Sequence, residues 1–233
     1  MASSTSSQIF KLYQYVFNSR GNLLDMLEDR GYDVSQYRNY TEDEIKVMYN
    51  NHMIGKFEMK SEIGPLDIYL EKKSGSETEK IYVKYRLEMK FKRTSNLQNQ
   101  INEIYETLLG GKDTLIIMNI GRVLLKAGTK DKPDEEFMNY FYVTKGYFVQ
   151  LFGLENFLFN VSRHSFVPKH RILSKQETQD VLAKYNCTIK NLPTIKRDDP
   201  QAKYIGLRPR QVCEITVVNI TSGTTVRYRL CVH

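Results

Sequence analysis

Three charged residues in the first half of the chain have the spacing of a metal-dependent nuclease. Pro65-Leu66-Asp67 lies where a strand is expected to begin, and Glu88-Met89-Lys90 lies on the next expected strand. In such a site Asp67 and Glu88 would bind Mg²⁺ through carboxylate oxygens, and Lys90 would orient or activate the attacking water. Because residues two positions apart on a strand share a face, Glu88 and Lys90 would point the same way.

The same residues also fit a solvated strand face, and this is the interpretation that we favour. Alternating charges are common on exposed sheet faces, and an Asp followed later by Glu-x-Lys often occurs by chance. The Mg²⁺-dependent nuclease is therefore kept as the alternative function. The four histidines (His52, His164, His170 and His233) are scattered, and the chain has neither a Gly-x-Ser-x-Gly motif nor a Walker phosphate loop. We expect no catalytic residue, no cofactor and no bound metal.

The elements that would position these residues follow from the hydrophobic pattern. Apolar residues at three- and four-residue spacing predict a helix over 8–30, with Gly21-Asn22 as a candidate break and Gly31 as the stop. Thr41-Glu42-Asp43-Glu44 is a capping box that opens a second, short helix. Strands are expected at 66–70 and 80–92, joined by a turn at 74–76.

The strand expected at 80–92 alternates between apolar and mostly charged positions. Its odd positions, from Ile81 to Phe91, are apolar, and its even positions are mostly basic, so one face would be buried and a largely basic face would lie in water. A helix follows from Asn96 to Gly110-Gly111. Further expected elements are strands at 114–118, 140–143, 147–152 and 157–161 and a short helix at 121–127. This mixture predicts an α/β or α+β domain around one sheet.

Composition limits the class of protein. The chain has 233 residues, of which 41% are hydrophobic and 12% aromatic, so it can form a packed core. It contains no apolar run of about 18 residues and no signal-like start, so we expect neither a membrane span nor secretion. Three cysteines without CxxC spacing favour a reducing compartment over a disulfide framework or a zinc site. We expect an intracellular soluble protein.

The charge is concentrated at the C-terminal end. Residues 165–233 contain 12 basic and 5 acidic side chains and so carry the whole net charge of +7, while residues 1–164 contain 22 of each. Because composition shifts here, we place a domain boundary between residues 164 and 165. A compact basic module indicates an acidic or nucleic-acid-bearing partner.

Local signals are clear in this basic module. Ser174-Lys175-Gln176-Glu177 is a capping box that opens a helix running to Tyr185. Asp199-Pro200 starts another helix, which Gly206 ends. Two alternating strands, at 212–220 and 226–230, flank a turn at 221–224. The module is therefore predicted to be a small α+β unit.

The sequence of this module resembles the shared fifth subunit of eukaryotic RNA polymerases, whose C-terminal module makes up the whole of the corresponding archaeal subunit. The motifs that carry the resemblance are Phe166-Val167-Pro168-Lys169-His170, Leu173-Ser174, Leu182-Ala183-Lys184-Tyr185, Leu192-Pro193-Thr194-Ile195, residues 199–207 (DPQAKYIGL) and Arg227-Tyr228-Arg229. Near the N-terminus, Leu12-Tyr13 and residues 27–32 (LEDRGY) are similar to the family's opening helix.

The resemblance implies an α+β chain of two domains. Residues 1–164 would form an N-terminal α/β jaw domain with a nuclease-like mixed sheet but no nuclease activity, and residues 165–233 a C-terminal α+β assembly domain. It also implies a non-catalytic, structural subunit of a multisubunit DNA-directed RNA polymerase, which synthesises RNA as a complex. The C-terminal domain would dock on the largest subunit, and the jaw would lie near downstream DNA during transcription.

The implied partners are the largest subunit, the other polymerase subunits and downstream duplex DNA, with neither a membrane nor a second copy of the chain. The implied docking residues are Val167, Pro168, Lys169, His170, Arg171, Pro193, Asp199, Pro200, Tyr204, Gly206 and Arg229. Several of them have a structural alternative: Asp199, Pro200 and Gly206 also fit helix caps, and Tyr204 and Val167 also fit a core. Cations that could meet DNA phosphates without reading sequence are Lys84, Arg86, Lys90, Lys92, Arg93 and Arg122.

The chain departs from the family's usual pattern in places. Arg210 stands where the family usually has Gly, so a turn that needs a positive φ would be strained there. The segments 74–80 and 130–136 also differ from the typical cellular protein. This divergence favours a homologue from a large cytoplasmic DNA virus, located in the virion and the cytoplasmic viral factory; a cellular homologue would be nuclear.

Overall fold

The computed structural model of the chain describes all residues except 1, 58–59, 75–76, 88–94, 121–132 and 220–222. The chain forms two compact units, Met1–Phe159 and Asn160–His233, which we call the N-terminal and C-terminal units. The structure therefore divides the chain between residues 159 and 160, whereas composition alone suggested 164 and 165. Each unit is described by itself.

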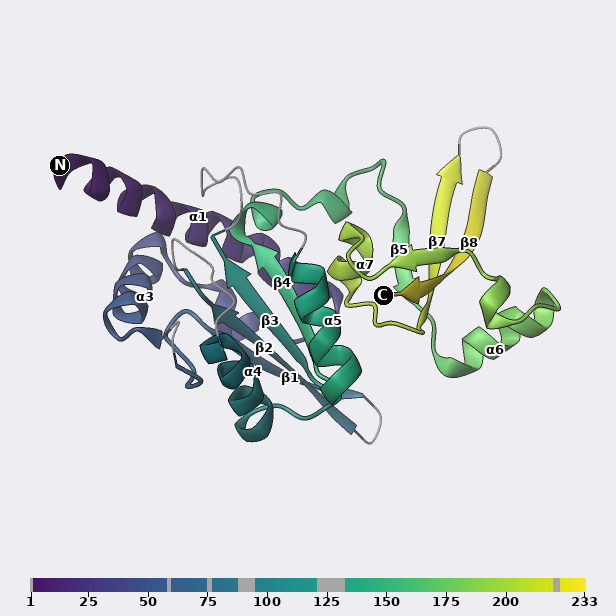
Figure 1. Cartoon of the computed structure of the whole chain (residues 1–233). Helices are drawn as coiled ribbons and strands as arrows, with labels where there is room; N and C mark the ends of the chain where they lie inside the picture. The colour runs from purple at the N-terminus through teal and green to yellow at the C-terminus, as the bar shows by residue number, and fades with distance from the viewer. Residues whose placement is uncertain (1, 58–59, 75–76, 88–94, 121–132, 220–222) are drawn as a thin grey trace. The chain divides into compact units, whose positions relative to one another are not determined.

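The N-terminal unit is built around a four-stranded mixed sheet (Figure 1). The strands are β1 (Ile68–Ser74), β2 (Glu77–Tyr85), β3 (Thr114–Asn119) and β4 (Phe148–Gly153), and they lie in the order β1-β2-β3-β4. The β1–β2 pair is antiparallel, while β2–β3 and β3–β4 are parallel. The α+β class and the mixed sheet predicted for this half of the chain are confirmed.

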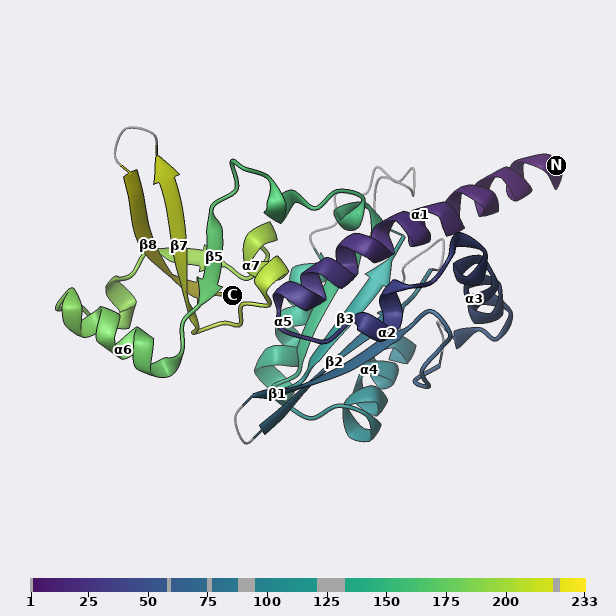
Figure 2. The same cartoon turned by 180° about the vertical axis from the view of Figure 1, so that it is seen from behind.

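Helices cover both faces of this sheet. The long helix α1 (Ala2–Asp29) crosses one face, and α4 (Ser95–Thr107) and α5 (Pro133–Lys145) lie on the other, as Figures 1 and 2 show from opposite sides. The short helices α2 (Ser35–Arg38) and α3 (Glu42–Ile54) connect α1 to β1. Because both faces are covered, the side chains of β3 and β4 are buried almost without alternation.

The helix predicted near the N-terminus is present without its candidate break. Helix α1 runs continuously through Gly21-Asn22, and the Asn22 side-chain amide donates to the Phe157 carbonyl at 2.7 Å. The helix ends before Gly31, which adopts φ +87° as a stop residue should. The capping box at Thr41 is also confirmed at the start of α3.

Two strand predictions are wrong. Residues 140–143 lie inside α5. Phe141 is 1% exposed and Val143 is 70% exposed, whereas residues two positions apart on a strand would share one face. Residues 157–161 fall across two short 3₁₀ helices, Leu154–Phe157 and Val161–Arg163. Short apolar runs do not distinguish strands from buried helix turns, and the tertiary contacts decide. The helix expected at 121–127 lies outside the described residues.

The C-terminal unit contains a second four-stranded sheet. Strands β5 (Lys169–Ile172), β6 (Thr194–Lys196), β7 (Val212–Asn219) and β8 (Gly223–Val232) lie in the order β5-β7-β8-β6. Helix α7 (Pro200–Ile205) packs on one face, and α6 (Lys175–Lys184) and a 3₁₀ turn (Ile189–Asn191) lie between β5 and β6 in the chain. Buried Ile195, Ala202, Leu207, Cys213, Ile215 and Cys231 form the core.

The helix ends of this unit match the sequence signals. The Glu177 N–H donates to Ser174 Oγ at 3.2 Å, and the Ser174 N–H donates back to the Glu177 carboxylate at 2.8 Å. Asp199 Oδ1 accepts from the backbone N–H groups of Gln201 and Ala202 at 2.9 and 3.2 Å, and Gly206 ends α7 with φ +73°. The two predicted caps and the glycine stop are confirmed. Among the described residues, no helix is long and apolar enough to cross a membrane.

Arg210 adopts φ +72°, in the left-handed region that favours glycine. Its N–H donates to the Cys231 carbonyl at 2.9 Å, so the turn is held in place despite the strain. We expect Arg210→Gly to stabilise the C-terminal unit by about 1 kcal/mol, because glycine has no Cβ to clash there. Gly206→Ala, at an equivalent φ, should change stability by a similar amount in the opposite direction. Urea unfolding of the variants tests this, and a destabilised Arg210→Gly would contradict it.

Candidate functional site

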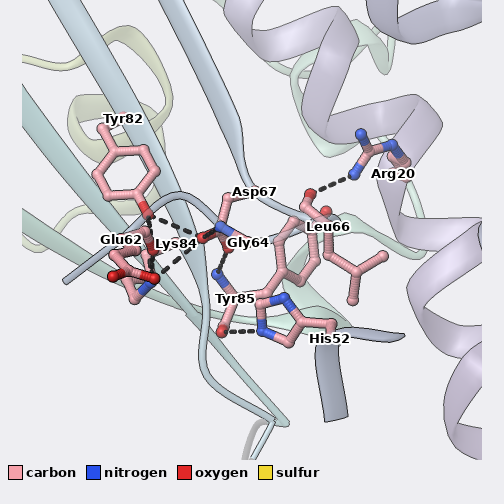
Figure 3. A network of polar contacts seen from close by, with 9 residues as sticks. All are labelled: Arg20, His52, Glu62, Gly64, Leu66, Asp67, Tyr82, Lys84 and Tyr85. Carbon is pink, nitrogen blue, oxygen red and sulfur yellow. Dashed lines mark hydrogen bonds and ion pairs between the residues drawn. The ribbon is translucent and has the colours of Figure 1, made fainter. Parts of the chain in front are cut away.

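Asp67, the first residue of the nuclease pattern, is buried immediately before β1 (Figure 3). Its Oδ2 accepts from the Gly64 N–H at 2.7 Å, the Tyr82 hydroxyl at 2.8 Å and the Lys84 ammonium at 3.2 Å. Its Oδ1 accepts from the Tyr85 N–H at 2.9 Å. Three of the four donors therefore converge on Oδ2 and one meets Oδ1, so each carboxylate oxygen has at least one partner within the protein.

This geometry assigns Asp67 a structural role. A metal ion would have to displace the donors that already satisfy both carboxylate oxygens, and the site gives it no solvent-facing side. Glu88 and Lys90, the other two members of the pattern, lie outside the described residues. Among the described residues, no group of three His, Cys, Asp or Glu side chains is arranged to hold a metal. Asp67 is therefore not placed to bind Mg²⁺ as the nuclease hypothesis requires.

The interpretation of Lys84 and Arg86 as part of a solvated basic face is wrong. Both side chains are buried, with exposed fractions of 4% and 3%. Lys84 pairs with Asp67 and also donates to the Glu62 carbonyl at 3.0 Å. Burial, followed by the effect of the Asp67 carboxylate, raises the pKa of Tyr82, which keeps its hydroxyl protonated as a donor. Neither cation is available to DNA phosphates.

Two further residues of this network were not singled out from the sequence. Arg20 on α1 donates to the Leu66 carbonyl at 2.8 Å, and the His52 Nε2 on α3 lies 3.0 Å from the Tyr85 carbonyl (Figure 3). Both side chains are buried. They tie two helices to the strand ends around Asp67. The sequence could not predict these two contacts, because the partners of Arg20 and His52 are backbone carbonyls of residues far away in the chain.

Part of the predicted docking set lines one open groove of the C-terminal unit. This groove, with a volume of about 280 Å³, is lined by Pro168, His170, Ile195, Asp199, Ile215, Val217, Arg227 and Arg229. The cross-strand register explains why they meet. Ile215 on β7 lies opposite both His170 on β5 and Arg227 on β8, and paired residues share a face of the sheet. Asp199 enters from the start of α7.

The other predicted docking residues are distributed elsewhere in the unit. Arg171, one residue from His170 and so on the opposite face, forms ion pairs with Glu177 at 2.6 Å and Glu214 at 3.3 Å. Lys169 shares that face and is exposed. The remaining members of the predicted docking set are placed by the fold of the unit. Val167 is half-buried, and the Pro193 carbonyl accepts a hydrogen bond from the Leu230 N–H. Pro200 begins α7 and Gly206 ends it, while the hydroxyl of half-buried Tyr204 accepts a hydrogen bond from the Asn160 side-chain amide.

Four lining residues were missed from the sequence as site residues: Ile195, Ile215, Val217 and Arg227. A signal for Arg227 was present, because it lies two positions before Arg229 on a predicted strand and must share its face. The apolar three could not be distinguished from core residues in the sequence, and in the structure Ile195 and Ile215 are indeed core residues.

Two of the three cysteines are protected by the fold. Burial raises the pKa of the Cys213 thiol to about 11 and that of Cys231 to about 12. Since the thiolate is the reactive form, and about one thousandth of a thiol with a pKa near 11 is ionised at pH 8, both should resist modification. We expect one fast reaction with a thiol reagent, at half-buried Cys187, and two more after unfolding. Three equally fast reactions in the native protein would contradict this.

Comparison with known proteins identifies the family to which the C-terminal unit is similar. Residues 159–231 match the family model of the RNA polymerase Rpb5 C-terminal domain. The chain is 43% identical over 74 residues to DNA-directed RNA polymerase subunit Rpo5 of Archaeoglobus fulgidus, an alignment that covers 32% of this chain and 97% of that subunit. It is 42% identical over 75 residues to subunit Rpo5 of Pyrococcus abyssi, covering 32% of this chain and 92% of the relative.

A longer eukaryotic relative matches over a smaller share. The chain is 37% identical over 84 residues to the subunit rpabc1 of DNA-directed RNA polymerases I, II and III of Dictyostelium discoideum, covering 36% of this chain and 43% of that protein. The relatives are thus subunits of multisubunit RNA polymerases. The chain belongs to the Rpo5/Rpb5 family of RNA polymerase subunits.

Proposed function

We propose that the chain is a non-catalytic subunit of a multisubunit DNA-directed RNA polymerase, docked on the largest subunit through its C-terminal unit. The observation that carries the proposal is the family match over 159–231, which spans almost the whole C-terminal unit. The N-terminal unit would form a jaw near downstream duplex DNA during transcription. The relatives are themselves polymerase subunits, which supports this assignment.

The surface of the C-terminal unit suits docking. Phe166, two residues before the groove residue Pro168, is 89% exposed, and Val161 is 57% exposed. Aromatic side chains such as that of Phe166 are enriched at protein interfaces, and so is arginine. An exposed aromatic residue and an open groove lined by two arginines therefore support a protein partner for this unit.

Contacts of the jaw with DNA would be non-specific and directed to phosphates. With Lys84 and Arg86 buried, the remaining candidates are Lys90, Lys92, Arg93 and Arg122, all outside the described residues. The proposed function also sets the location: the virion and cytoplasmic viral factory for the polymerase of a large DNA virus, or the nucleus for a cellular one.

Affinity capture tests this proposal. The tagged full-length chain, expressed in its native source and captured at moderate salt, should bring down the two large polymerase subunits in near-stoichiometric amounts. Neither the unsubstituted chain nor the Asp67→Asn variant should cleave DNA in the presence of Mg²⁺ or Mn²⁺. Capture without the large subunits would refute the proposed function, and Asp67-dependent cleavage would restore the nuclease alternative.

A further inference from the structure

Tyr37 on α2 takes the place of a neighbouring strand at the outer edge of β1. Since β1 is the end strand of its sheet, one of its two edges has no described strand beside it. At this edge the Tyr37 hydroxyl donates to the Tyr69 carbonyl at 3.2 Å and accepts from the Tyr69 N–H at 3.2 Å. These two bonds replace those that a residue of a paired strand would make.

The bonds of Tyr69 show which residues of β1 direct their backbone groups outward. Backbone N–H and C=O groups alternate between the two edges of a strand, so Glu71 and Lys73 face the same way as Tyr69, whereas Leu70 faces β2. An outer edge of this kind is a template on which another chain can pair. Tyr37 therefore closes the first of three outward positions.

Apart from Tyr37, helix α2 is held lightly. None of its four residues is buried. Arg38 forms ion pairs with Asp25, at 2.8 Å, and with Glu28, but its own side chain is 36% exposed, and exposed pairs contribute little. The Arg20 guanidinium lies 5.8 Å from the centre of the Tyr37 ring and helps to keep it in place. A segment held in this way can open locally without unfolding of the unit.

The outward positions of β1 are complementary to those of a second copy of the chain. When two β1 strands pair edge to edge in the antiparallel direction, one register places Glu71 of each copy opposite Lys73 of the other and so forms two pairs of opposite charge. In this register Lys72 meets Lys72 of the other copy, but each is already paired with Glu79 at 3.1 Å. A second copy is therefore the occupant that this edge fits.

We propose that Tyr37 guards the outer edge of β1 and so keeps the chain from pairing with itself. While its hydroxyl holds the Tyr69 N–H and C=O groups, a second strand cannot reach this end of β1. Opening of α2 exposes the edge, and two copies then join into one continuous sheet through the backbone groups of Glu71 and Lys73. The guard belongs to the N-terminal unit alone and does not depend on the proposed function.

Hydrogen exchange measured by NMR on the full-length chain tests the guard itself. Tyr37→Phe removes the hydroxyl and keeps the ring, so the Tyr69 amide should exchange about tenfold faster. The Leu70 amide, which faces β2, should exchange at an unchanged rate and is the internal control. An unchanged exchange rate at Tyr69 would overturn the inference, because the hydroxyl would then not protect the edge.

Analytical sedimentation of full-length variants tests what the guard prevents. The unsubstituted chain should be a monomer, and Tyr37→Ala, which removes the ring as well, should form dimers as its concentration is raised. The matched control is Tyr40→Ala, because the Tyr40 ring also lies near the Arg20 guanidinium, at 6.0 Å, but makes no hydrogen bond with the described residues of β1. A monomeric Tyr37→Ala, or equal dimerisation of Tyr40→Ala, would overturn the inference.

Charge variants distinguish strand pairing from aggregation of a misfolded protein. Added to Tyr37→Ala, Lys73→Glu places carboxylates opposite each other and should return the chain to a monomer. Adding Glu71→Lys as well brings back opposite charges and should restore the dimer. Association that persists with Lys73→Glu, or that the exchanged pair does not restore, would show that the copies do not meet through β1 and would overturn the inference.

Discussion

Asp67→Ala is expected to lower the free energy of unfolding of the N-terminal unit by about 3–5 kcal/mol, because it breaks a buried ion pair from one side. The Lys84 ammonium would stay in a site where 4% of its side chain is exposed, without its carboxylate. The donors from Gly64, Tyr82 and Tyr85 would lose their acceptor at the same time. Each buried donor left unsatisfied adds to the cost.

Hydrogen exchange of the β3 amides reports on this unit alone, and so is the measurement of choice. The matched control is Glu71→Gln, which removes an exposed carboxylate paired with Lys80 at 3.5 Å. That variant should lose less than about 1 kcal/mol, because water screens exposed pairs. If Asp67→Ala and Glu71→Gln had equal effects, Asp67 would not be the structural centre of the unit, and a role in binding would have to be reconsidered.

Leu207→Ala is expected to destabilise the C-terminal unit by about 2–5 kcal/mol. Leu207 is 1% exposed and lies in the core beside Ala202 and Cys231. The unit contains only residues 160–233, and domains of this size have little stability in reserve. We therefore expect loss of the folded unit at 37 °C together with loss of polymerase capture.

Exchange of the β7 and β8 amides measures this effect, and Val218→Ala is the matched control. Val218 is 78% exposed on β7, so its truncation should change stability by less than about 0.5 kcal/mol. A Leu207→Ala protein that kept slow exchange in β7 would show that the core is not held together around this residue.

The features that could be predicted from the sequence are those set by local chemistry. The capping boxes at Thr41 and Ser174, the Asp199-Pro200 helix start and the glycine stops at Gly31 and Gly206 depend on neighbouring residues, so a single sequence contains them. The positive φ of Arg210 was also foreseeable, from the glycine that usually stands there in the family.

The features that could not be predicted depend on what packs against each face. The alternation in β2 suggested a solvated basic face, but helices cover both sides of the sheet, and Lys84 is buried with a carboxylate 17 positions away in the chain. The alternation of side-chain types along a strand shows that its two faces differ in polarity, but it does not show which face is exposed to water. When both faces are covered by helices, the alternation therefore cannot predict which residues are buried. The groove likewise depends on strand pairing, which brings His170, Ile215 and Arg227 together from distant parts of the chain.

The most direct test of the central claim compares the two units in polymerase capture. Residues 160–233 and residues 1–159 would each be tagged and presented to the largest polymerase subunit, with the full-length chain as the reference. We predict that residues 160–233 retain the subunit as well as the full-length chain does, and that residues 1–159 do not retain it. Retention by residues 1–159 and none by residues 160–233 would contradict docking through the C-terminal unit.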